Sequence, residues 1–328
     1  MRGPTRGQAR GPDWRLTSHG YHVPSYADGS RLDQRIVEAA VVLKEGNGAV
    51  TGWAAFAWLG ARWFDGSTAD GGCLPVDLAV RRKIRAQPGF AICEEGIDPA
   101  DVIVVDGLPI TIPVRSVCFA MRYAATVRDA VRAIDMAAYS DLVSIDEVRT
   151  YAGTRPRTGL SSWTGIPRCR EATEHGDENR WSPQEVTMGM IWVIDAGLGR
   201  PRSNVPIFDR SGRHLCTPDL LDEEAGVVGE YNGELHLERS QRARDVRREE
   251  VYRELGLESF TMLAGDSADP AGMARRMRAA RSRARCLPPH ERPWTTQPPA
   301  WWTPTETVEQ RRALSESQRE RFLGYRAA

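Results

Sequence analysis

Apolar positions in the first half of the chain switch between helical and strand-like spacing. Helical spacing comes first, in Ile36, Ala39, Ala40 and Leu43, and Gly46 is placed to end this helix. Thr51 is expected to cap a second helix that ends near Gly60. Short β-like runs follow at 76–80, 90–95 and 101–112, and helical patterns at 116–124, 127–142 and 145–153. The pattern along residues 33–180 therefore predicts an α+β domain followed by a linker.

After residue 180 the pattern becomes a compact series of shorter elements. Helical spacing is followed by three strand-like runs, a long charged helix and a final strand, at 182–197, 203–210, 214–221, 227–231, 240–256 and 259–265. The predicted order is α-β-β-β-α-β. With a basic helix at 270–286, this makes residues 181–286 a second domain, and the whole chain an α+β or α/β protein.

The two ends of the chain differ in composition from these domains. Residues 1–32 are rich in Gly, Arg and Pro, and residues 14–25 alternate around a Gly turn, which favours a small hairpin. Residues 287–328 form a Pro- and Trp-rich tail whose last stretch predicts a helix capped near Thr305. The N-terminus has no apolar core segment and no run approaches membrane-spanning length, so we expect a cytoplasmic protein.

Composition narrows the classes of partner and metal site. The chain has 44 Lys and Arg against 44 Asp and Glu, so any surface for nucleic acid must be a local patch. Almost all of these cations are arginines, which suits a GC-rich genome as well as phosphate recognition. The six cysteines show no CxxC pair and no zinc spacing, so we expect reduced and mostly buried thiols. We assign Trp53, Trp58 and Trp63 to packing.

The helix predicted at 270–286 is the strongest candidate for a basic patch. It carries six arginines and no acidic residue between 271 and 286. Its apolar stripe consists of Met273, Met277, Ala280 and Ala284. Arg275, Arg278 and Arg285 point elsewhere, as expected for a helix that faces phosphates. A packing helix with a solvated basic side explains the same pattern.

Two carboxylates on the strand-like runs suggest a metal site. Side chains alternate along a strand, so Glu230 and Asn232 share a face. If the polar residues 222–226 form the turn, paired residue numbers sum to about 448 or 449. Asp219 then lies within one position of Glu230, and like charges that close need compensation, for which Mg²⁺ is suited. Alternatively, Asn232 and Gly233 end the strand, and Glu230 is an exposed carboxylate at a sheet edge.

Other polar residues near this hairpin have both chemical and structural interpretations. Glu185 completes a capping box that begins at Ser182, and this capping role accounts for Glu185 without any catalytic role. His236 follows the second strand and can act as a base, metal ligand or phosphate contact, or be a solvated surface residue. Arg244 and Arg248 share a face of the charged helix, where they can reach a phosphate, pair with an acid or remain solvated.

The sequence around these carboxylates resembles a known family. The segments are SPQE (182–185), GLGRPRSNVPIFD (197–209), TPDLLDEEAGVVGEYNGELH (217–236) and RDVRREEVYRELGLE (244–258). They resemble the C-terminal domain of actinobacterial AbiEi-antitoxin-like proteins, a PD-(D/E)xK restriction-endonuclease-like fold related to very-short-patch-repair endonucleases. Segments within 34–137 and the tail at 301–326 resemble other parts of the same proteins, so the resemblance covers most of the chain.

The resemblance implies roles for individual residues. Pro218 and Asp219 match the PD element, Glu230 the acid of the second strand, and Glu185 a carboxylate on the first helix. In such nucleases these acids hold one or two Mg²⁺ ions, or Mn²⁺ in their place, with Asp219 and Glu230 as the metal ligands here. Asn232 stands where active enzymes have Lys, and His236, Arg244 or Arg248 is a candidate substitute.

Two functions follow from the resemblance. The first is a metal-dependent DNA endonuclease or nickase, in restriction or phage defence. The second is a non-catalytic, type IV antitoxin-like regulator that uses a degenerate nuclease fold to bind nucleic acid or a cognate toxin protein. Relatives commonly begin with a winged helix that reads operator DNA, of which residues 14–25 resemble the closing wing.

Overall fold

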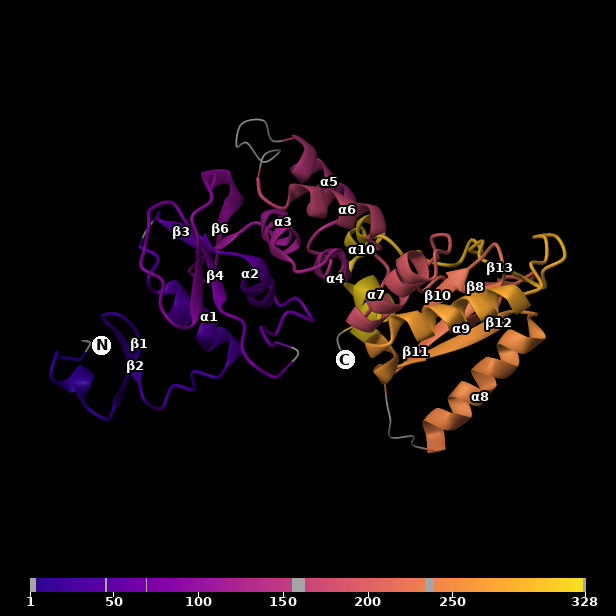
Figure 1. Ribbon diagram of the computed structural model, residues 1–328, viewed down its shortest axis with the longest axis horizontal. Coiled ribbons are helices and arrows are strands. Elements are labelled where there is room, and N and C mark those ends of the chain that lie inside the picture. The colour runs from indigo at the N-terminus through magenta and orange to yellow at the C-terminus, as the bar shows by residue number, and fades with distance from the viewer. Residues whose placement is uncertain (1–3, 45, 69, 155–162, 234–238, 327–328) are drawn as a thin grey trace. The chain divides into compact units, whose positions relative to one another are not determined.

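The computed structural model describes residues 4–44, 46–68, 70–154, 163–233 and 239–326. By internal contacts the chain divides into two compact units, Met1–Thr173 and Glu174–Ala328. Each unit combines helices with its own sheets, which include parallel and antiparallel pairs (Figure 1). The prediction of a mixed α and β protein is therefore confirmed. In the described part of the chain, every helix is too short or too polar to traverse a bilayer.

The described part of unit 1 contains a hairpin, a larger sheet and several helices, apart from short turns. The strands are β1 (Trp14–Ser18), β2 (Tyr21–Pro24), β3 (Gly48–Val50), β4 (Val76–Val80), β5 (Phe90–Cys93), β6 (Val102–Val105) and β7 (Leu108–Thr111). The helices that precede or follow them are α1 (Leu32–Ala40), α2 (Gly52–Trp58), α3 (Pro113–Tyr123), α4 (Val127–Tyr139) and α5 (Ile145–Thr154), and α6 (Ile166–His175) crosses the unit boundary. The hairpin predicted at 14–25 is confirmed by antiparallel pairing of β1 with β2.

The main sheet of unit 1 has the order β5-β4-β3-β7-β6. Its central strand β3 was missed by the sequence patterns, because three residues between two helices give no measurable alternation. Helices α1 and α2 pack on this sheet, α3 packs on α2, and α4 and α5 pack on α3 (Figure 1). The core beneath α1 and α2 contains Ile36, Val50, Leu78 and Ile110.

Two assignments in unit 1 need correction. Thr51 does stand at the N-cap position of α2, but its side chain makes no capping hydrogen bond. Its hydroxyl accepts instead from the Thr111 hydroxyl at 2.8 Å, inside the core. Trp53 is buried as expected, whereas Trp63 is 41% exposed and has a positive φ of 74°, so it is a turn residue and not a core residue.

Unit 2 contains the elements predicted after residue 180. Its helices are α7 (Pro183–Met190), the π-helical turn η4 (Ile191–Asp195), α8 (Arg239–Glu254), the 3₁₀ turn η5 (Ala264–Ala268), α9 (Pro270–Arg283), α10 (Val308–Arg312) and α11 (Glu316–Leu323). Its strands are β8 (Ile207–Asp209), β9 (His214–Cys216), β10 (Leu220–Asp222), β11 (Val227–Asn232), β12 (Glu258–Leu263) and β13 (Trp294–Thr295).

These strands form two small sheets, one with the order β10-β11-β12 and the other β13-β8-β9. β10 and β11 are an antiparallel hairpin, and β12 returns parallel to β11 after the α8 crossover. An antiparallel bridge between Arg202 and Leu221 adds a further short segment beside β10. The carboxyl ends of β11 and β12 therefore lie side by side, next to α8.

The β10-β11-β12 sheet is covered on both faces, and the alternation along each strand assigns its side chains. Leu220, Val227 and Phe260 pack with η4 and the methionines of α9. Leu221 and Val228 pack on the opposite face with Tyr252 of α8 and with Leu255, just after its end. By the same alternation Glu230 and Asn232 face α8.

Two segments of unit 2 depart from the predicted elements. Residues 214–221 are not one strand: β9 ends at Cys216 and β10 begins at Leu220, and the two strands belong to different sheets. The tail forms two short helices in place of one, and their N-caps are Thr307 and Ser315 rather than Thr305. Within the tail, β13 pairs with β8, a contact that no local pattern indicates.

Candidate functional site

The β10–β11 hairpin brings Asp219 next to Glu230. Paired residue numbers sum to 449, from Leu220 with Gly229 to Asp222 with Val227, as the sequence predicted. Asp219 directly precedes β10, and its Oδ2 accepts a hydrogen bond from the Tyr231 backbone N–H at 2.7 Å. This hydrogen bond holds the Asp219 side chain against β11, at the residue that follows Glu230.

Glu230 is held from α8 by two side chains. The Tyr252 hydroxyl donates to Oε1, and Arg248 Nη1 donates to Oε2 at 2.5 Å. The Glu230 side chain is 13% exposed, whereas that of Arg248 is 48% exposed. The interpretation of Glu230 as an exposed edge carboxylate is therefore wrong, because β12 and α8 cover it. Arg248 pairs with an acid, one of the roles that the helical spacing allowed.

Burial and mutual repulsion shift the protonation of this pair. Burial and the Asp219 charge raise the pKa of Glu230 to about 7, against the lowering effects of Tyr252 and Arg248. Burial also raises the pKa of Asp219, while the Tyr231 N–H and Arg248 lower it. Both carboxylates thus favour a compensating positive charge, and Arg248 provides it for both.

A cavity of about 350 Å³ opens beside Glu230, between α8, the end of β11 and the first half of β12. Its walls include Asn232, Arg248, Glu249 and Thr261. Asn232 therefore shares this cavity with Glu230, as their common strand face predicted. The cavity is polar enough for a charged ligand, and Arg248 is the cationic group on its described walls.

Glu185 is buried on α7, and its carboxylate is already hydrogen-bonded. Ser182 caps the helix by accepting from the Glu185 backbone N–H at 3.2 Å. The carboxylate accepts from the Trp181 N–H, the Ser182 hydroxyl and the Asn204 amide at 2.7, 2.9 and 2.6 Å. The Ser182 N-cap is thus confirmed, but the second half of the predicted capping box is not formed, because the Glu185 carboxylate accepts from the Trp181 N–H and not from the Ser182 N–H. Burial first, and the Asp219 charge second, raise the pKa of Glu185 to about 8.

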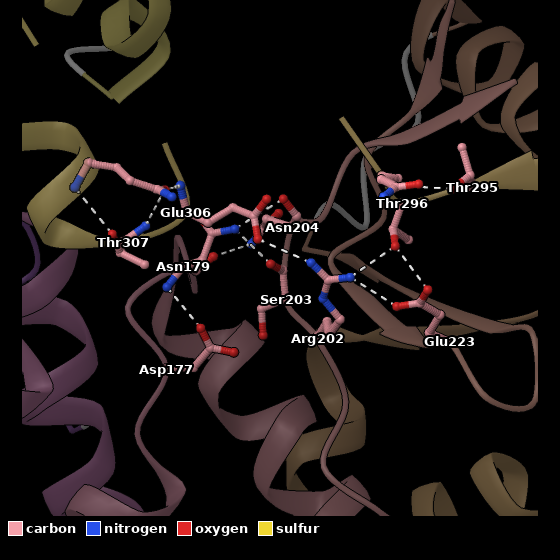
Figure 2. Close-up of polar contacts among 12 residues, drawn as sticks. Asp177, Asn179, Arg202, Ser203, Asn204, Glu223, Thr295, Thr296, Glu306 and Thr307 are labelled. Atoms are coloured by element: carbon pink, nitrogen blue, oxygen red, sulfur yellow. Dashed lines mark hydrogen bonds and ion pairs between the residues drawn. The ribbon is translucent and has the colours of Figure 1, made fainter. Parts of the chain in front are cut away.

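Asn204 connects Glu185 to the start of the hairpin. Its Nδ2 donates to Glu185 and, at 2.7 Å, to the Asn179 carbonyl. Asn179 Nδ2 donates back to the Ser203 carbonyl at 2.7 Å (Figure 2). The Asn204 backbone N–H donates to the Asp219 carbonyl at 3.3 Å. Asn204 Oδ1 is buried and has no hydrogen-bond partner among the described residues.

Arg202, on the other side of Asn204, attaches the tail to this region. It donates to Glu223 Oε2 at 2.9 Å and to the Thr296 hydroxyl at 3.0 Å, and it pairs with Glu306 at 3.3 Å (Figure 2). The residues next to the carboxylates are therefore held by hydrogen bonds from α7, the hairpin and the tail.

The donor set is compatible with Mg²⁺. Asp219 and Glu230 supply carboxylates, and Asn204 Oδ1 is a third hard oxygen that lacks a partner. Mg²⁺ sites commonly use one or two carboxylates and complete their coordination with water and phosphate oxygens. No group of three or more His, Cys, Asp or Glu side chains placed to hold a metal occurs in the described ranges. All six cysteines are free thiols, of which three are buried.

The arginines of the basic helix α9 fall into two sets, those with a carboxylate partner and those without one. Arg276 pairs with Asp266, Arg281 with Asp222 and Glu224, and Arg283 with Glu258. Arg278 donates to the Asp195 carbonyl at 3.0 Å. Arg275, and Arg285 just beyond the helix, are exposed and make no ion pair with any described residue. The three arginines selected from the sequence are thus the ones without a carboxylate partner.

Two of the predicted site residues lie wholly or partly outside the described part of the chain, and two residues that contact the carboxylates were not predicted. His236 lies outside the described residues. Arg244 belongs to α8, but its side chain lies outside the described part. Tyr252 was missed although it follows Arg248 by four residues, a spacing that places both on one helix face. Asn204 was missed because no local pattern indicates its contact with α7.

Comparison with known proteins adds no assignment to this geometry. No protein-family model, curated protein or solved structure matches the chain.

Proposed function

We propose that the protein is a metal-dependent endonuclease that hydrolyses DNA phosphodiester bonds. The observation that carries the proposal is the closeness of Asp219 to Glu230: Asp219 Oδ2 accepts a hydrogen bond from the N–H of Tyr231, and the Asp219 charge raises the pKa of Glu230, which lies beneath α8 and beside a polar cavity. The resemblance of residues 182–258 to PD-(D/E)xK nucleases supports it, since these acids match the acids of that motif. The β10-β11-α8-β12 order is also consistent with that fold.

Asp219 and Glu230 would hold Mg²⁺, with Asn204 Oδ1 as a further oxygen nearby. When bound, the ion would supply an activated water and stabilise charge on the leaving oxygen. Asn232 stands where active relatives have Lys, so the ammonium of that position is missing here. The charge of Arg248 lowers the pKa of both carboxylates, and we assign to Arg248 the phosphate contact that the lysine would make.

Nicking of supercoiled plasmid in Mg²⁺ or Mn²⁺ tests this function. We expect activity in the wild type and a loss of at least about 100-fold in Asp219→Asn and Glu230→Gln, because each removes a ligand charge. Glu224→Gln is the matched control, since this carboxylate is 89% exposed and lies in the hairpin turn. Wild-type cleavage no faster than that of Asp219→Asn would exclude the enzyme.

The hydrogen bonds that Glu230 already accepts favour a second function. Both of its oxygens accept hydrogen bonds from α8, and Asn232 replaces the motif lysine. A nucleic-acid-binding regulator of the antitoxin type, with a cognate toxin protein as partner, needs no metal. Gel shifts that persist unchanged in EDTA, without cleavage when Mg²⁺ is restored, would favour this regulator over the endonuclease.

A further inference from the structure

The two side chains that hold Glu230 differ in how firmly they are placed. Tyr252 is 2% exposed and belongs to the core between α8 and the sheet. Arg248 is about half exposed, and its guanidinium lies at the wall of the cavity. Arg248 can therefore leave Glu230 without disturbing the core, whereas Tyr252 cannot.

Arg248 occupies the place that a metal ion would need. Its Nη1 donates to Glu230 Oε2 at 2.5 Å, and its charge also stabilises ionised Asp219. A divalent cation bound to the same carboxylates would lie within a few ångströms of the guanidinium, where like charges repel strongly. The cation and Arg248 therefore compete for Glu230.

The cavity offers a second position for the guanidinium. A backbone phosphate there would accept two N–H bonds from an arginine, the geometry that guanidinium groups favour. Glu249 lines the same cavity, so a phosphate without a cationic partner would be repelled. Phosphate entry therefore requires a cation on this wall, and Arg248 meets that requirement once it has left Glu230.

We propose that Arg248 is an exchangeable counter-ion: a DNA phosphate draws it away from Glu230, and the site then accepts its divalent cation. The inference rests on the proposed nuclease function and adds a regulation to it. Without DNA, Arg248 keeps the carboxylates neutralised and the affinity for metal low. Because binding couplings are reciprocal, the metal must also tighten the binding of DNA.

Mn²⁺ binding, followed by the electron paramagnetic resonance of the free ion, tests the exchange independently of cleavage. Titrations are made with and without a short DNA duplex, and a titration of the duplex alone is subtracted. We expect Arg248→Gln to bind Mn²⁺ between about five- and 150-fold more tightly than the wild type without DNA. DNA should raise the affinity of the wild type by a similar factor and that of Arg248→Gln very little.

Arg247→Gln is the matched control, because it removes one positive charge from the adjacent exposed position of α8. It is expected to keep the wild-type affinity and the wild-type response to DNA. Equal Mn²⁺ affinities in Arg248→Gln and Arg247→Gln would overturn the exchange and leave the nuclease proposal standing. So would a wild-type affinity that DNA does not change, a measurement that needs no variant. Absence of Mn²⁺ binding under all conditions would overturn both proposals.

Discussion

Glu185 and Glu230 are both buried carboxylates of unit 2, but their donors differ. Glu185 accepts from the Trp181 backbone, a serine hydroxyl and the Asn204 amide, which are all neutral and buried or partly buried. Glu230 accepts from Tyr252 and from Arg248, and the latter is charged and half exposed. Neutral, fixed donors make Glu185 part of the scaffold, whereas an exchangeable cation leaves Glu230 available to a ligand.

Asp77, the second residue of β4 in unit 1, makes the stability of the protein depend on pH. Burial raises its pKa to about 7, and no described side chain forms a hydrogen bond with its carboxylate. The folded state therefore favours the protonated form. The stability associated with the protonated Asp77 carboxyl is fully present below the unfolded pKa near 3.8 and is lost as the pH rises through about 7.

We expect Asp77→Asn to stabilise the protein by about 1 to 3 kcal/mol at pH 8 and to have little effect at pH 4. Urea unfolding at the two pH values measures the difference. Glu171→Gln, at an exposed position of α6, serves as the control and should be neutral at both. Equal effects of Asp77→Asn at pH 4 and pH 8 would contradict the titration of Asp77 in this range.

At the scale of elements, the hairpin that carries the carboxylates was the best predicted part of the site. Its register followed from a turn predicted at residues 222–226, which the structure confines to 223–226, and from alternation along the two strands. The same alternation placed Asn232 with Glu230 on the side of the cavity. Local sequence was sufficient here because a shift by one residue would turn Glu230 and Asn232 away from α8 and onto the opposite, apolar face of the sheet.

Other elements depend on contacts that are distant in sequence. β3 has three residues and is defined by β4 and β7 on its two sides. The break at Thr217 and Pro218 is invisible in an apolar run, since both of its halves satisfy strand spacing. Glu230 is held by Tyr252, which is 22 residues away, and Asn204 reaches Glu185 over 19 residues. Periodicity within a window cannot report such pairings.

Gly229 allows the close packing of β11 against β12. A Cβ at this position would lie 2.4 Å from the Phe260 ring, and that ring stacks on Trp192 with a centroid separation of 5.7 Å. We expect Gly229→Ala to destabilise the protein by about 1 to 3 kcal/mol, because the ring has to move within a packed core. Urea unfolding compares it with Gly265→Ala, where a Cβ would meet open space. Equal losses in the two variants would contradict the predicted clash.

At the scale of the whole molecule, positive and negative charges balance, so any affinity for DNA has to come from a local surface. Total positive and negative charges are equal at 44 each. Three arginines of α9 are neutralised by Asp222, Glu224, Glu258 and Asp266. Arg275 and Arg285 remain exposed and unneutralised within the described part of the chain, so they contribute positive potential that the net charge conceals.

The salt dependence of binding distinguishes these two sets of arginines. Each phosphate contact to duplex DNA contributes about 0.9 to the slope of log affinity against log salt concentration. We expect Arg275→Gln and Arg285→Gln each to reduce the slope by about this amount and to weaken binding equally for all DNA sequences. Arg283→Gln, whose guanidinium pairs with Glu258 at 2.6 Å, should change the slope much less. Fluorescence anisotropy over a series of salt concentrations provides the slopes. Equal slopes in all three variants and the wild type would remove α9 from the DNA-binding surface, because a contact that releases counter-ions cannot be lost without changing the slope.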